Sequence, residues 1–84
     1  MAYSTEALQE AHRYSSHHRD SIESSDLCGC FHCVSTFRCD EIKEWTDGES
    51  TALCPYCGID AVLGDVDVSD LSVEFLTAMQ EYWF

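Results

Sequence analysis

Two C-x2-C pairs, separated by twenty residues, constrain the fold of this chain more than any other feature. Cys30-Phe31-His32-Cys33 and Cys54-Pro55-Tyr56-Cys57 together give the pattern C-x2-C-x20-C-x2-C, a spacing that is typical of zinc sites. Each pair turns the backbone so that two thiolates reach one ion, and a glycine such as Gly58 permits the left-handed backbone that such turns favour. We predict one structural Zn²⁺, with iron as a substitute for it, bound by Cys30, Cys33, Cys54 and Cys57.

The second pair taken alone allows another interpretation, a redox dithiol. Cys54-Pro55-Tyr56-Cys57 resembles the C-P-Y-C motif of glutaredoxins, whose dithiol lies near the N-terminus and opens a helix. Here only 27 residues follow Cys57, and they begin with the glycine-containing and β-branched stretch GIDAVLGDVDV. Pro55 is also the only proline, so the cis-proline of that fold has no counterpart. The sequence therefore disfavours a glutaredoxin-like reductase.

The remaining cysteines and histidines leave some assignments open. Cys28-Gly29-Cys30 overlaps the first pair, so Cys28 is an alternative ligand to Cys30, and Cys39 is expected to be a packing or capping thiol. If these two thiols are reactive, the alternative function is thiol redox chemistry or metal handling. The zinc deaminase signature, the H-E-x-x-H metalloprotease motif, the P-loop and the G-x-S-x-G elbow are absent, and we predict no catalytic residue. No two histidines are spaced i, i+4, so we expect ordinary solvated or hydrogen-bonded roles for His12, His17, His18 and His32.

A chain of 84 residues is one domain, and one of this size hides only roughly 60–65% of its unfolded surface on folding. The stripe Leu8, Ala11, Ser15, His18 and Ile22 predicts an N-terminal helix, followed by a polar hinge, over residues 1–26. Residues 27–84 are expected to form the ribbon core, with a short helix over 39–45 and a C-terminal helix over 72–83. The predicted fold is thus a small α+β zinc ribbon with two knuckles on short hairpins.

Two resemblances support this interpretation. The stretch Cys54-Pro55-Tyr56-Cys57-Gly58 resembles the second knuckle of rubredoxins and of zinc ribbons, although Val34 replaces the glycine that follows the first knuckle in rubredoxin itself. Over the longer span 28–84, CGCFHC, TALCPYCGID and EFLTAMQEYW resemble a family of small bacterial cytoplasmic proteins with no established activity. The second resemblance implies a zinc-binding fold and nothing further.

The charge restricts the kinds of partner. The net charge is −12, and after residue 19 fourteen acidic residues face only Arg38 and Lys43. Nucleic-acid binding needs clustered Lys and Arg, so we expect none, and a basic protein partner is favoured instead. Residues 1–20 lack the apolar segment of a secretory signal, and no apolar run reaches the roughly 20 residues of a membrane helix. We therefore expect a cytoplasmic protein without a membrane role, and the sequence leaves its oligomeric state open.

Overall fold

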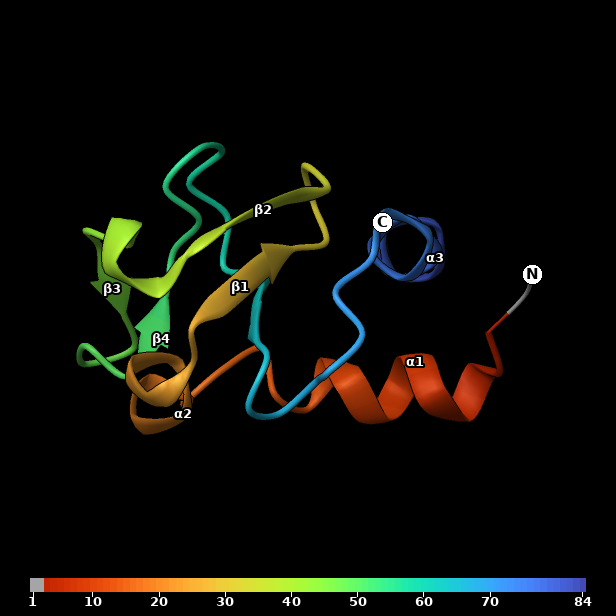
Figure 1. Cartoon of the computed structure of the whole chain (residues 1–84), viewed down its shortest axis with the longest axis horizontal. Helices are drawn as coiled ribbons and strands as arrows, with labels where there is room; N and C mark the ends of the chain where they lie inside the picture. Colours follow the sequence, from red (N-terminus) through yellow and green to blue (C-terminus); the bar gives the residue numbers. More distant parts are fainter. Residues whose placement is uncertain (1–2) are drawn as a thin grey trace.

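Three helices surround a small antiparallel sheet in the computed structural model, which describes residues 3–84 (Figure 1). The fold class is small α+β. The helices are α1 (Thr5–His12), α2 (Arg19–Ser24) and α3 (Val73–Trp83), and a 3₁₀ turn, η1, spans Cys39–Glu41. The strands are β1 (Leu27–Cys30), β2 (Ser35–Arg38), β3 (Trp45–Thr46), β4 (Thr51–Ala52) and β5 (Val62–Gly64).

The main sheet has the order β2-β1-β5, with β1 at its centre. Strand β1 pairs antiparallel with β2, from Leu27 opposite Arg38 to Cys30 opposite Ser35. Its other edge pairs antiparallel with β5, which places Cys30 opposite Val62. Strands β3 and β4 form a separate two-stranded ladder. The central strand therefore carries Cys30, the first cysteine of the pattern, directly into the core.

The first knuckle lies on a hairpin, as expected, but the second does not. The turn at Cys30–Cys33 joins β1 to β2, which pair with each other. The strands on either side of the second knuckle, β4 and β5, belong to different sheets, because β4 pairs with β3 and β5 pairs with β1. Residues that suit strands on either side of a knuckle do not determine which strand each one pairs with.

The N-terminal segment forms two helices rather than the single predicted one. Helix α1 begins after Ser4, whose hydroxyl accepts a hydrogen bond from the Ala7 N–H, and ends near Arg13, and α2 begins at Arg19. Between them, His17 adopts a left-handed backbone with φ of 49°. All five residues of the predicted stripe are nevertheless buried: Leu8, Ala11, Ser15, His18 and Ile22. The stripe thus identified the inward-facing residues, although the helix is broken between them, and the expected hinge over 21–26 is partly α2.

Of the other two expected helices, the one over 39–45 is much shorter than predicted, whereas the one over 72–83 agrees with α3. Only Cys39–Glu41 is helical in the segment 39–45; Ile42 is extended, and Trp45 pairs with Ala52 in the β3–β4 ladder. Helix α3 begins after Ser72, whose hydroxyl accepts from the Phe75 N–H at 3.2 Å. Serine at this position satisfies one of the free N–H groups at the helix start.

Helix α3 closes one face of the main sheet and also contacts α1. A Cβ built on Gly29 would lie 3.1 Å from a methyl group of Leu76, so glycine in β1 lets α3 approach closely. In Figure 1, α3 is seen end-on while α1 lies in the plane of the view, so the two helices cross. The Trp83 indole N–H donates to the Leu8 carbonyl oxygen, and Gln9 donates to the Tyr82 hydroxyl. These contacts attach the N-terminal segment to the core.

Candidate metal centre

The two knuckles bring the four predicted cysteines together. The sulfur atoms of Cys30, Cys33, Cys54 and Cys57 all lie within 4.8 Å of one another, close enough to bind one metal ion. Two of the contacts run between knuckles, at 3.6 Å from Cys30 to Cys57 and 3.7 Å from Cys33 to Cys54. Tetrahedral metal–sulfur bonds of about 2.3 Å place the sulfurs about 3.8 Å apart, so the observed separations fit such a centre.

The first knuckle follows the end of β1. Its backbone turns so that the His32 N–H donates to the Cys30 sulfur at 3.3 Å. Val34, which follows the second cysteine, has φ of 56°. A β-branched residue is rarely found in the left-handed region. The knuckle therefore forms without the glycine that the rubredoxin pattern places there, and Val34 retains backbone strain.

The second knuckle is closed by its own backbone rather than by paired strands. The Tyr56 N–H donates to the Cys54 sulfur at 3.3 Å, which repeats the hydrogen bond of the first knuckle. The Gly58 N–H donates to the Cys54 carbonyl oxygen at 2.9 Å, and the Cys54 N–H donates to the Ile59 carbonyl oxygen at 3.0 Å. Gly58 has φ of 77°, the left-handed conformation that was expected for it.

Burial differs between the four sulfurs. Cys30 and Cys54 are buried, whereas Cys33 and Cys57 are half-buried. Burial raises the pKa of the Cys30 thiol well above its usual range and also raises the pKa of Cys57. At Cys33 burial acts in the same direction, but hydrogen bonds from the Ser35 side chain and the neighbouring thiols lower the pKa overall. Because metals bind thiolates, loading this cluster releases protons.

The other two cysteines lie outside the cluster. Cys28 is fully buried in β1, and burial, together with the nearby Cys39 and Asp65, raises its pKa to about 12. The Cys39 thiol donates to the Ser25 carbonyl oxygen at 2.6 Å. The structure thus groups Cys30 with the second knuckle and leaves Cys28 apart, which favours Cys30 in the choice that the sequence left open.

His12 and His32 pack against aromatic rings near the end of the chain, and the buried Nδ1 of His32 has no hydrogen-bond partner within residues 3–84, unlike the solvated or hydrogen-bonded role expected for it. The His12 ring lies 4.0 Å from the Trp83 ring, and the His32 ring lies 4.8 Å from the Phe84 ring, both centre to centre. The Gln80 amide donates to the His32 carbonyl oxygen, which fixes the first knuckle against α3. Within residues 3–84, the cluster that could hold a metal contains cysteines and no histidine.

His18 links the N-terminal segment to the strand that leads into the second knuckle. Its Nδ1 lies 2.5 Å from the Tyr14 carbonyl oxygen, and its Nε2 accepts from the Ala52 N–H at 3.0 Å. This pairing requires the neutral ring with the proton on Nδ1. Burial lowers the pKa of His18, although the Tyr14 carbonyl and Asp67 oppose the shift. The sequence suggested an unremarkable histidine here, because the partner is more than thirty residues away.

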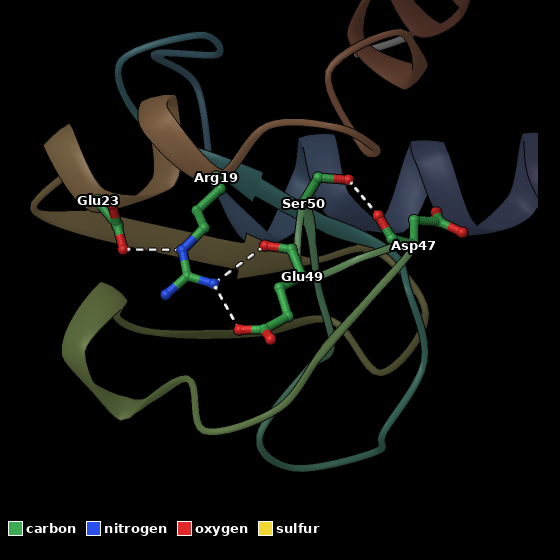
Figure 2. A network of polar contacts seen from close by, with 5 residues as sticks. All are labelled: Arg19, Glu23, Asp47, Glu49 and Ser50. Atoms are coloured by element: carbon green, nitrogen blue, oxygen red, sulfur yellow. Dashed lines mark hydrogen bonds and ion pairs between the residues drawn. The ribbon is translucent and has the colours of Figure 1, made fainter.

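A second set of contacts joins α2 to the β3–β4 turn (Figure 2). The Arg19 guanidinium bonds to the Glu23 carboxylate and to both the carbonyl and the carboxylate of Glu49. The same guanidinium lies 4.5 Å from the centre of the Trp45 ring. Within the turn, the Ser50 hydroxyl donates to the Asp47 carbonyl oxygen. These contacts hold the hairpin that precedes Cys54 in a fixed position relative to α2.

Comparison with known protein families, with curated proteins and with solved structures gives no match. Among residues 3–84, no helix has both the length and the apolar character needed to cross a bilayer. The chemistry of the site therefore follows from its own geometry. That geometry defines a four-cysteine centre able to bind one metal ion.

Proposed function

We propose that this chain is a zinc ribbon with one structural zinc ion, and that it acts in the cytoplasm by binding a basic protein partner without catalysing a reaction. The observation that carries the proposal is the mutual approach of four cysteine sulfurs from two knuckles. Four thiolates occupy all four positions of a tetrahedral ion, whereas catalytic zinc sites keep one position for water or substrate. Iron binds the same donor set and is the expected substitute.

The proposed cytoplasmic location is supported by the chemistry of the metal ligands. Thiolates bind metal only while they are reduced, and a reducing compartment keeps them so. The half-buried Cys33 and Cys57 would otherwise be open to oxidation. The two sulfurs of the C-P-Y-C motif lie 3.6 Å and 3.7 Å from sulfurs of the other knuckle, which supports a metal centre over an isolated dithiol.

A basic partner is supported by how the few cations are used. Arg13, Arg19 and Arg38 already form ion pairs within residues 3–84, with Glu10, Glu23, Glu49 and Asp40 as their partners. The pairs of Arg13 and Arg38 are largely exposed and contribute little to stability, whereas the Arg19 side chain is only 38% exposed. Most of the sixteen acidic residues are left without an ion pair in this region. The negative electrostatic potential of these residues attracts a basic surface and repels nucleic acid.

Metal analysis and melting test the structural role of zinc. We expect native mass spectrometry to find one zinc ion per chain, and a strong chelator to abolish the cooperative melting transition. Structural zinc contributes on the order of 10–16 kcal/mol in finger peptides, more than a core of this size supplies alone. Cooperative melting after complete metal removal would refute the structural role.

A matched pair of variants tests the ligand assignment. Cys57→Ser is expected to lose the metal, because serine replaces one of the four clustered sulfurs. Cys39→Ser is expected to keep it, since the serine hydroxyl preserves the bond to the Ser25 carbonyl. Loss of metal from both variants would contradict the assignment.

Capture from cytosol tests the binding role. The chain should retain a basic protein at low salt and release it as salt increases, because screening weakens exposed charge pairs. Reversal of exposed acidic residues should abolish capture while the zinc content stays at one ion per chain. If the zinc-loaded chain captures nothing at low salt, the binding function is wrong and the structural site still stands.

A further inference from the structure

An open groove lies between α1 and α3, on the opposite side of α3 from the residues that it buries in the core. Tyr3 and Leu8 line it on one side, and Val73, Ala78 and Tyr82 line it on the other. The groove has a volume of about 820 Å³. Val73 is 65% exposed and Tyr82 is 42% exposed, so apolar surface reaches solvent here.

The groove has a fixed shape. Contacts from Trp83 to the Leu8 carbonyl and from Gln9 to the Tyr82 hydroxyl join its two walls. Tyr3 is fixed in turn, because its hydroxyl donates to Asp70 and its ring packs edge-on against Phe75. A pre-formed groove avoids the ordering entropy that a partner would otherwise have to offset.

The charge around the groove has one sign. Glu74 and Glu81 line it, and no Lys or Arg does. Within residues 3–84 neither glutamate forms an ion pair. A second copy of the chain would bring the same two carboxylates to the interface, where like charges oppose association. The occupant that complements this surface is apolar at its centre and basic at its edges.

The groove's shape points to a helix as that occupant. Its α3 wall consists of two neighbouring rows with helical spacing, Val73, Thr77 and Glu81 beside Glu74, Ala78 and Tyr82. The wall spans Val73 to Tyr82, about 14 Å at 1.5 Å per residue, which matches two to three turns of a partner helix. Helices in grooves are held by apolar anchors at i, i+3 or i+4, and i+7.

We propose that the α1–α3 groove binds an amphipathic helix with an apolar stripe flanked by Lys or Arg, supplied by another protein. The inference rests on the proposed binding of a basic partner and adds the place and the shape of the contact. Helix α1 contributes one wall of this groove, and Figure 1 shows it crossing α3 on the side away from β3 and β4.

The test is a titration of the zinc-loaded, ¹⁵N-labelled chain with a synthetic helical peptide of about 18 residues, with leucine at i, i+4, i+7 and i+11 and lysine beside them. We expect amide shifts in α3 and the facing part of α1, and an affinity that falls with salt. A peptide with glutamate in place of lysine should bind at least about 10-fold more weakly, because it meets Glu74 and Glu81.

Three variants locate the contact. Glu81→Lys should weaken binding by about 10-fold, while Glu44→Lys, the same charge change at an exposed residue outside the groove, should change it less than about 2-fold. Val73→Gln should weaken binding without a change of charge. Because Val73, Glu81 and Glu44 are all exposed, folding is expected to be unaffected, and the zinc content and the amide spectrum check this.

The outcomes separate the two proposals. Equal weakening by Glu81→Lys and Glu44→Lys, or shifts confined to the knuckles and the β3–β4 turn, would overturn the groove while leaving an acidic binding module. Shifts in the groove that depend on protein concentration without peptide would identify a second copy as the occupant and overturn the inference. Absence of binding to the lysine peptide at low salt would overturn the groove inference, while capture from cytosol decides separately whether the chain binds a basic partner.

Discussion

Replacing Gly58 by alanine tests how far the second knuckle depends on its left-handed residue. Gly58 has φ of 77°, and a Cβ built there meets no atom within 4 Å. The substitution therefore causes no clash, and its whole effect comes from the backbone conformation. A left-handed residue with a Cβ costs roughly 1–2 kcal/mol, only partly offset by the lower entropy of alanine in the unfolded chain. We expect the free energy of unfolding to fall by about 1 kcal/mol, or about 4–8 °C in Tm.

Gly48 supplies the matched control. It also has a left-handed backbone, with φ of 67°, and a Cβ there also meets nothing within 4 Å, but it lies in the β3–β4 turn. Gly48→Ala should therefore destabilise the protein by a similar amount. Only Gly58→Ala should also weaken zinc binding, because Gly58 directly follows Cys57 and its N–H bonds to the Cys54 carbonyl.

The two glycine variants are compared by denaturant unfolding of the zinc-loaded protein and by competition with a chelator of known affinity. A Gly58→Ala protein as stable as the parent chain would refute the conformational reasoning. Equal loss of zinc affinity in both variants would show that zinc binding follows global stability and not the geometry of the knuckle.

Three further predictions concern residues outside the cluster. His18 is neutral when it accepts from Ala52, and burial lowers its pKa in the folded protein. The free energy of unfolding should therefore be highest above the unfolded pKa of about 6.5 and decline as the pH falls towards the pKa of the folded state. His18→Gln should flatten that decline in urea unfolding measured across pH. Gly64→Ala should destabilise by about 1–3 kcal/mol in the same assay, because the new Cβ clashes with the Ser25 hydroxyl; unchanged stability would contradict this. Cys28 is fully buried and its pKa is raised to about 12, so it should resist iodoacetamide at pH 8 in the folded protein. Rapid labelling seen by mass spectrometry would contradict this and favour the alternative function in thiol redox chemistry.

The cysteine cluster could be predicted from the sequence because each C-x2-C turn is a local geometry that lets two thiolates reach one metal ion. The buried residues of the N-terminal segment were predictable for a similar reason, since the period of an apolar stripe survives even where the helix is interrupted. The interruption itself has no glycine or proline to mark it. Short-range hydrogen bonds, from the Tyr14 N–H to Ala11 and from the Ser15 N–H to His12, tighten the last turn of α1 instead.

Strand pairing around the second knuckle could not be predicted. The β-branched and apolar residues near Val62 favour a strand but do not indicate that its partner is β1, more than thirty residues earlier. The left-handed conformation of Val34 could not be predicted either, because β-branched residues rarely adopt it. The contact between His18 and Ala52 joins residues that are 34 apart in the sequence, so nothing near His18 in the chain reveals it.

The central position of β1 also determines the order in which the molecule can fold. The β1–β2 hairpin closes over neighbouring residues, and such hairpins form in about 1–10 μs. Pairing of β5 with β1 joins Cys28 to Gly64 across a long loop, and closing it is the slower step. The first knuckle should therefore exist as a two-sulfur half-site before the second arrives. We expect the rate of refolding, and not only the final stability, to increase with the concentration of free zinc.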